Sequence, residues 1–103
     1  MTVSALRFDG VTAESSTLHR TNLTIWLSPS ALTEWSGDPV EAFEIPRSML
    51  RTATVVERPR GHAGAVALTA TLHGRYVRWL IRGATAESIT ALKAWVAQLK
   101  VAP

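Results

Sequence analysis

The chain has 103 residues, of which 47% are hydrophobic and 18% charged, and its formal net charge is +3 at pH 7. This length suits one domain over residues 1–103, and the apolar content excludes a mainly disordered chain. The absence of cysteine excludes disulfides, thiol nucleophiles and cysteine-based metal sites. We expect a soluble, cytoplasmic protein without a secretory signal or a transmembrane segment, because no apolar run approaches the ~20 residues that a membrane span requires.

Charge is divided unevenly along the chain. Residues 1–44 carry two arginines against six carboxylates, a net charge of −4, and residues 45–103 carry nine basic side chains against two glutamates, a net charge of +7. If the two parts form different faces, the surface is polarised and attracts an anionic partner. The alternative is that the two faces neutralise each other across strand edges.

The beginning of the chain predicts a tight hairpin. The apolar run 5–8 meets Asp9-Gly10, a dipeptide that suits the positive φ angles of a two-residue turn. Residues 11–13 are then expected to form the returning strand.

Alternating apolar residues predict several strands in the middle of the chain. Thr21-Asn22 has the composition of a loop, and in the strand that follows Trp26 faces outward, opposite an apolar face formed by Leu23, Ile25 and Leu27. Further strands are expected over 32–35, 40–45 and 49–57. In the last of these it is ambiguous which side chains face inward, and a bulge would reconcile the two alternations. Within the second of these, Phe43 and Ile45 share one face.

The best-specified element is a hairpin over residues 65–82. Its strands, 65–72 and 75–82, flank His73-Gly74, a two-residue turn with glycine second. The register set by this turn gives a core face of wholly apolar pairs: Val66 with Ile81, Leu68 with Trp79, and Ala70 with Val77. The outer face then pairs Thr71 with Tyr76, Thr69 with Arg78, Ala67 with Leu80, and Ala65 with Arg82.

The last part of the chain changes to a helical period. Thr85 is a suitable N-cap, and Glu87 places a negative charge in the first turn, where it suits the helix dipole. One stripe of the helix is apolar and must be buried against a sheet or a barrel mouth: Ile89, Leu92, Trp95, Val96 and Leu99.

This order of short strands and a final helix resembles the pleckstrin-homology (PH) superfold, and within it bacterial PH-like or GRAM-like domains. The local resemblance lies in the strands 23–28 and 32–35, then Phe43-Glu44-Ile45-Pro46, then Met49-Leu50. It implies a mainly β fold (α+β by count): a barrel of about seven antiparallel strands in two sheets, with the C-terminal amphipathic helix plugging one end. Members of the family bind phosphoinositides, peptides or other proteins.

The sequence departs from the family at two places. Phosphoinositide-binding members carry basic residues in the second strand, whereas residues 23–28 contain none. Arg47 stands where the family usually has an apolar residue. The resemblance therefore favours the fold more than it favours recognition of an inositol phosphate.

Two groups of basic residues are candidate binding sites. Tyr76, Arg78 and Arg82 share the outer face of the hairpin, and Arg51 is expected to join them as a cationic patch for a carboxylate or phosphate group. The alternative is a solvated face on which the arginine stems cover a neighbouring leucine.

The second group lies in the loop 58–64. Arg58, Arg60 and His62 are candidates for gripping a phosphate, with glycines that let the backbone approach it. The alternative is a solvent-exposed loop without a ligand.

Catalysis and metal binding lack a motif in this sequence. The three histidines have no second ligand at metal-binding spacing, and no nucleophile motif or phosphate loop is present. We expect a non-enzymatic protein-interaction module without a small-molecule cofactor, whose partner is an acidic protein surface or a second copy of the chain. Alternatives are anionic lipid bound through the basic loops and, less favoured, nucleic acid stacked on Trp26 and Trp35.

Overall fold

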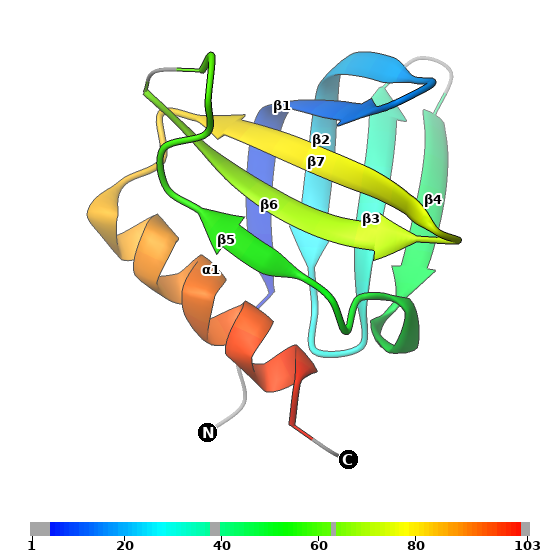
Figure 1. Ribbon diagram of the computed structural model, residues 1–103, viewed down its shortest axis with the longest axis vertical. Coiled ribbons are helices and arrows are strands. Elements are labelled where there is room, and N and C mark those ends of the chain that lie inside the picture. Colours follow the sequence, from blue (N-terminus) through cyan, green and yellow to red (C-terminus); the bar gives the residue numbers. More distant parts are fainter. Residues whose placement is uncertain (1–4, 38–39, 63, 102–103) are drawn as a thin grey trace.

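The structure is a computed structural model that describes residues 5–37, 40–62 and 64–101. Within these residues, seven strands form one antiparallel sheet and an α-helix follows them (Figure 1). The sheet order is β4-β3-β2-β1-β7-β6-β5. The elements are β1 (Leu6–Ser15), β2 (His19–Leu27), β3 (Ala31–Gly37), β4 (Val40–Pro46), a 3₁₀ turn η1 (Arg47–Met49), β5 (Thr54–Val56), β6 (Ala65–Leu72), β7 (Arg75–Arg82) and α1 (Ala86–Leu99).

The mainly β fold with seven antiparallel strands and a C-terminal helix is confirmed, but the closed barrel of two sheets is not. Strand β1 pairs with β2 on one side and with β7 on the other, so the strands belong to one continuous sheet. The edge strands β4 and β5 are not hydrogen-bonded to each other, so the sheet stays open. In Figure 1 strands β5, β6 and β7 cross in front of β2, β3 and β4, so the sheet is folded over on itself.

Strand β1 contains an irregularity where the sequence predicts a hairpin. Gly10 has the expected positive φ of 65°, but the chain continues in the same strand instead of reversing. The register of β1 against β2 shifts between Phe8 and Val11 and again between Val11 and Ala13. The Asp9-Gly10 hairpin is therefore wrong: the left-handed residue forms a bulge in a strand that pairs on both sides.

Two further local expectations are also corrected. Thr21-Asn22 lies inside β2 rather than in a loop, with a left-handed Asn22 at φ 60°. Only the segment Thr54–Val56 of the expected strand 49–57 is extended, because the chain after Pro46 first makes the turn η1.

The hairpin of β6 and β7 has the predicted register. Every pair from Ala65 with Arg82 to Leu72 with Arg75 is present, and both turn residues have positive φ, 51° at His73 and 77° at Gly74. The core face is buried as expected except at Val77, which is only partly buried, and Trp79 is wholly covered.

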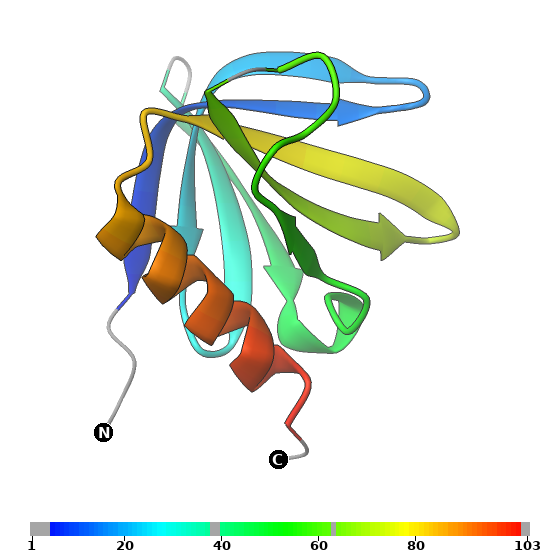
Figure 2. The ribbon, with the colours of Figure 1, turned by 60° about the vertical axis from the view of Figure 1, so that its left-hand side comes forward.

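Helix α1 lies at one end of the folded sheet and leaves the opposite end uncovered (Figure 2). It begins as predicted: the hydroxyl oxygen of Thr85 accepts a hydrogen bond from the Ser88 backbone N–H at 3.1 Å. Leu92, Trp95, Val96 and Leu99 are buried, and Ile89 packs against the core while only partly buried.

Polar contacts fix the helix in this position. Trp95 donates its indole N–H to the Ser28 carbonyl at 2.7 Å, and Arg47 donates to the carbonyls of Gln98 and Val101, both at 2.6 Å. Both carbonyls lie at the C-terminal end of α1, so Arg47 joins the turn η1 to that end of the helix. Over the described residues, no helix has the length and apolar character needed to cross a membrane.

Candidate functional site

The predicted residues of strand β7 share its outer face. Tyr76 is 59% exposed, and Arg78 and Arg82 follow it two and six residues later, on the same side of the strand. Leu80 occupies the same face between the two arginines, yet only 2% of it is exposed. Something must therefore cover this face between Arg78 and Arg82.

The covering segment is the loop that carries the second group of candidate residues. His62 Nε2 lies 3.2 Å from Nη2 of Arg78, and His62 Nδ1 lies 3.4 Å from Nη2 of Arg82. Pro59, three residues earlier, is buried, so the loop is folded against the sheet. The structure thus brings the two candidate groups together, and we call His62, Arg78 and Arg82 the basic cluster.

The basic cluster contains more hydrogen-bond donors than acceptors. A guanidinium group only donates, and a neutral imidazole accepts at one of its two nitrogens. His62 therefore accepts from only one of the two arginines at a time. Other donors of the cluster remain available to an external carboxylate or phosphate.

One carboxylate already neutralises part of the cluster. Glu14, which lies opposite Arg78 in the β1–β7 register, binds its guanidinium at 2.7 Å. The hydrogen bond and the charge of Arg78 hold the pKa of Glu14 below its ordinary value. Arg82, in contrast, has no carboxylate within ion-pairing distance in the part of the chain that the structure describes. Neutralisation across strand edges is thus found at Arg78 and not at Arg82.

The remaining predicted residues are divided between two places. Arg58 and Arg60 are exposed in the same loop as His62. Arg51 does not join the cluster: with Leu99 and Lys100 it lines a small hollow of about 180 Å³ near the end of α1. The expected neighbourhood of Arg51 and Arg78 is wrong because only Thr54–Val56 pairs with β6, and Arg51 precedes that pairing.

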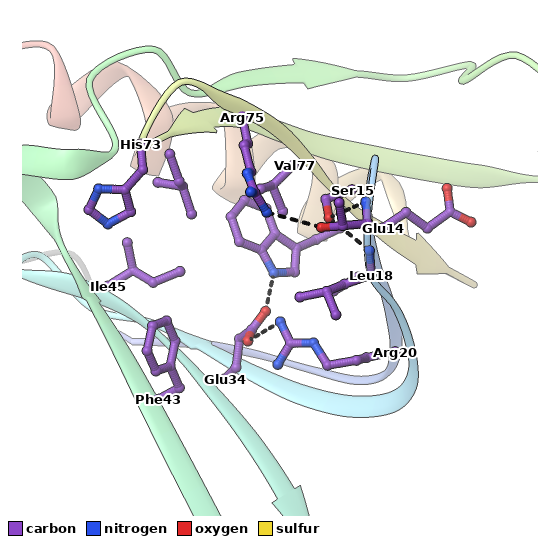
Figure 3. A pocket seen from close by; sticks show the side chains of 14 residues that line it. Glu14, Ser15, Leu18, Arg20, Glu34, Phe43, Ile45, His73, Arg75 and Val77 are labelled. Atoms are coloured by element: carbon purple, nitrogen blue, oxygen red, sulfur yellow. Dashed lines mark hydrogen bonds and ion pairs between the residues drawn. The ribbon is translucent and has the colours of Figure 1, made fainter.

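A second candidate site, absent from the sequence expectations, lies at the open end of the folded sheet. It is a pocket of about 410 Å³ between the tip of the β1–β2 hairpin, strands β3 and β4, and the turn of the β6–β7 hairpin (Figure 3). Ile45 and Val77 line its interior, and two exposed apolar side chains, Leu18 at 58% and Phe43 at 60%, stand at its lip. Phe43 shares the inward face of β4 with Ile45, as predicted, but most of its side chain remains exposed.

A buried carboxylate forms the floor of this open-end pocket. Glu34 is only 3% exposed, and its Oε2 accepts a hydrogen bond from the indole N–H of Trp79 at 2.6 Å. Its Oε1 lies 2.7 Å from Nη2 of Arg20, an ion pair whose angles do not satisfy hydrogen-bond geometry. The pair compensates the charge of Glu34, which would be costly to bury alone.

The rim of the open-end pocket carries basic side chains. Arg75 extends across it and donates to the hydroxyl of Thr17 at 3.1 Å, and His73 stands on the other side (Figure 3). Arg75 alternates with Tyr76 and Arg78 along β7, so it faces inward while they face outward. The pocket and the basic cluster therefore use opposite faces of one strand.

Two local features of the sequence could have indicated the floor of this pocket, although the sequence expectations did not use them. Glu34 has the same strand phase as Leu32, which directs a carboxylate toward the core, and a core Trp79 needs an acceptor for its N–H. Arg20 had no such signal, because the left-handed Asn22 and the register shift beside it change the phase of β2.

The outer face of β2 and β3 presents an aromatic pair. Trp26 is exposed as predicted, and its ring lies 6.1 Å from that of Trp35 at an angle of 55°. Asp9, on the neighbouring strand, binds Thr24 and Arg7 beside this pair. This carboxylate makes the surface less suited to a nucleic-acid backbone.

The described residues contain no group of three or more histidine, aspartate or glutamate side chains that could hold a metal ion. In comparisons with known proteins, no protein-family model matches the sequence and no curated protein sequence matches it significantly. The function is therefore argued from the geometry of the two candidate sites.

Proposed function

We propose that the chain is a PH-like, non-enzymatic module whose basic cluster binds an acidic segment of a partner protein. The order of the seven strands and the C-terminal helix at one end of the folded sheet support the PH-like part. In this proposal the halves β1–β4 and β5–β7 correspond to the two sheets of that family. They also correspond to the acidic and the basic parts of the chain.

The observation that carries the proposal is the position of His62 between Arg78 and Arg82. Packing an imidazole against two guanidinium groups gathers donors at one spot with a single internal carboxylate, Glu14. Such a concentration of donors is favourable when an acceptor arrives from outside, because charge-assisted hydrogen bonds are stronger than neutral ones. A carboxylate that reaches Arg82 meets a guanidinium without a carboxylate partner among the described residues.

A groove beside the cluster offers room for the partner's side chains. It measures about 420 Å³ and is lined by Tyr76, Arg78 and the end of β1. Tyrosine and arginine are the residue types that most often dominate binding energy at protein interfaces. The exposed Arg58 and Arg60 add positive charge in the same loop as His62, which speeds the approach of an acidic chain.

The test uses a fluorescein-labelled peptide of repeating glutamate and alanine, with binding followed by fluorescence anisotropy at low and at high salt. We expect Arg82→Gln to weaken binding about tenfold, the loss of one charge-assisted contact. Arg51→Gln makes the same change of charge at a distance from the cluster and serves as the matched control. Arg78 is a poorer target, because its loss also frees Glu14.

Equal weakening by both substitutions, or binding that salt does not reduce, would contradict the proposal. Vesicles with and without phosphatidylserine test the lipid alternative through Arg58 and Arg60: association that needs the acidic lipid, without peptide binding, would replace the protein partner by a membrane. Sedimentation at low and at high salt tests a second copy of the chain as the partner. A gel shift at low salt, where phosphate contacts are strongest, tests nucleic acid.

A further inference from the structure

The open-end pocket has the two properties of a site for an amphipathic molecule. Above the engaged carboxylate of Glu34, apolar side chains such as Ile45 and Val77 line its interior, and Leu18 and Phe43 remain more than half exposed at its lip. Large apolar side chains at the mouth of a concave site are a mark of ligand binding, because a bound apolar body removes them from water. The volume of about 410 Å³ lies in the range of small-molecule pockets.

The charges of the open-end pocket favour an anionic head group. Its two carboxylates are both engaged, Glu14 by Arg78 and Glu34 by Trp79 and Arg20. Arg75, at the rim, has only the neutral hydroxyl of Thr17 as a hydrogen-bond partner in the described residues. The rim thus keeps a positive charge without an anion.

We propose that the open-end pocket binds a small amphipathic carboxylate, with the carboxylate at Arg75 and the apolar body against Phe43, Ile45 and Val77. The guanidinium of Arg75 presents paired N–H groups that match the two oxygens of a carboxylate. Arg75 and Val77 face inward and the basic cluster faces outward, so the head group and the acidic partner would meet different arginines, although Glu14 lines the pocket and also binds Arg78.

A series of ligands with one apolar body and three head groups tests the chemistry. Isothermal titration calorimetry compares octanoate, octanol and octylamine, all as monomers in solution without membranes. We expect octanoate to bind at least about tenfold more tightly than octanol, because its carboxylate gains a charge-assisted hydrogen bond. Octylamine, which carries the same sign of charge as the rim, should bind most weakly. Equal affinities for the three, or no binding by octanoate, would overturn the proposal.

Two arginine variants then locate the head group. Arg75→Gln should weaken octanoate binding about tenfold and leave octanol binding unchanged, whereas Arg82→Gln should change neither. Arg75 lies at an exposed rim, so its substitution leaves the core intact. Equal effects of the two variants would show non-specific attraction and refute the site. The same two variants are also tested with the glutamate–alanine peptide, whose binding Arg82→Gln should weaken and Arg75→Gln should not. Failure of this proposal can therefore be distinguished from failure of the proposed function.

Nuclear magnetic resonance places the apolar body independently of affinity. Trp79 and Trp95 are both wholly buried and both donate their indole N–H, to Glu34 and to the Ser28 carbonyl respectively. Trp79 lines the pocket, and Trp95 belongs to helix α1, at the other end of the folded sheet. We expect octanoate to shift the indole signal of Trp79 and not that of Trp95. Equal shifts, or a shift at Trp95 alone, would place the ligand elsewhere and overturn the assignment.

Discussion

Glu34 is a carboxylate in the interior of a small domain, and two neighbours make this position tolerable. Trp79 satisfies one oxygen and Arg20 compensates the charge at the other. A buried ion pair of this kind adds little stability over an apolar pair, yet removing one partner leaves an uncompensated charge. Arg20 itself is 46% exposed and does not need Glu34 in order to be solvated. The cost of breaking the pair therefore falls on Glu34.

At the residue scale we predict that Arg20→Ala lowers the free energy of unfolding by about 2 kcal/mol or more. In the Glu34→Gln background the same substitution should cost much less, because no buried charge remains. Urea denaturation of the four proteins in this double-mutant cycle measures the difference. Arg7→Ala is the matched control, since Arg7 pairs with Asp9 where both side chains are largely exposed, and such pairs contribute little. An equal cost of Arg20→Ala in both backgrounds would contradict the prediction.

At the scale of elements, strand β1 holds the fold together because it pairs with both halves of the sheet. Its partner β2 runs beside it from Leu6 to Glu14, whereas β7 pairs only with the segment from Thr12 to Ser15. Gly10, with φ 65°, lies just before the segment shared with β7. The bulge there increases the local twist of the strand and lets its second part follow the other half of the sheet.

We predict that Gly10→Ala destabilises the protein by about 1 kcal/mol, because an alanine pays for the left-handed conformation. A Cβ at this position meets no atom within 4 Å, so the cost comes from the backbone and not from a clash. Gly10→Asn should cost clearly less, since asparagine adopts this conformation more readily. Thermal unfolding of the two variants measures the order. Equal losses for both would show that backbone conformation does not set the cost.

Elements whose specifying residues lie close together in the chain are the ones that the sequence predicts. The β6–β7 hairpin was predicted pair by pair, because a two-residue turn and the cross-strand pattern around it lie within eighteen residues. Helix α1 and its Thr85 cap were predicted because the cap and the apolar stripe also lie within one short segment. Gly10 was predicted in a hairpin turn and Asn22 in a loop, but both lie inside strands, because a left-handed residue fits a turn and a bulge equally well. Only the pairing partner decides between the two, and that partner lies elsewhere in the chain.

At the scale of the whole molecule, the candidate sites depend on contacts between distant segments. Alternation along β7 was enough to predict that Tyr76, Arg78 and Arg82 share a face. The contact of His62 with those arginines, and the distance of Arg51 from them, follow from how the connections on either side of β5 fold. The open-end pocket involves six strands and two turns, so no local pattern encloses it.

Ion pairs also connect the elements of the whole molecule, and three of their carboxylates have a lowered pKa. Asp9 is bound by Thr24 and by Arg7, and the contact with Thr24 joins β1 to β2. Glu14 is bound by Arg78, which joins β1 to β7. Glu57 is bound by Lys93, which joins the segment after β5 to α1. A carboxylate whose pKa is lower in the folded state stabilises the protein above its unfolded pKa. That contribution is lost as the pH falls through the folded value.

We predict from these shifts that the free energy of unfolding is steady above about pH 5 and falls as the pH is lowered toward about 3. The contact of Glu14 with Arg78 contributes to the free energy of unfolding only while Glu14 is ionised. Glu14→Gln should therefore be less stable than the unchanged protein near neutral pH, and its free energy of unfolding should fall less on acidification. Urea denaturation in steps of pH measures both curves. If they fall in parallel, Glu14 has the same pKa folded and unfolded, and the β1–β7 ion pair does not stabilise the fold.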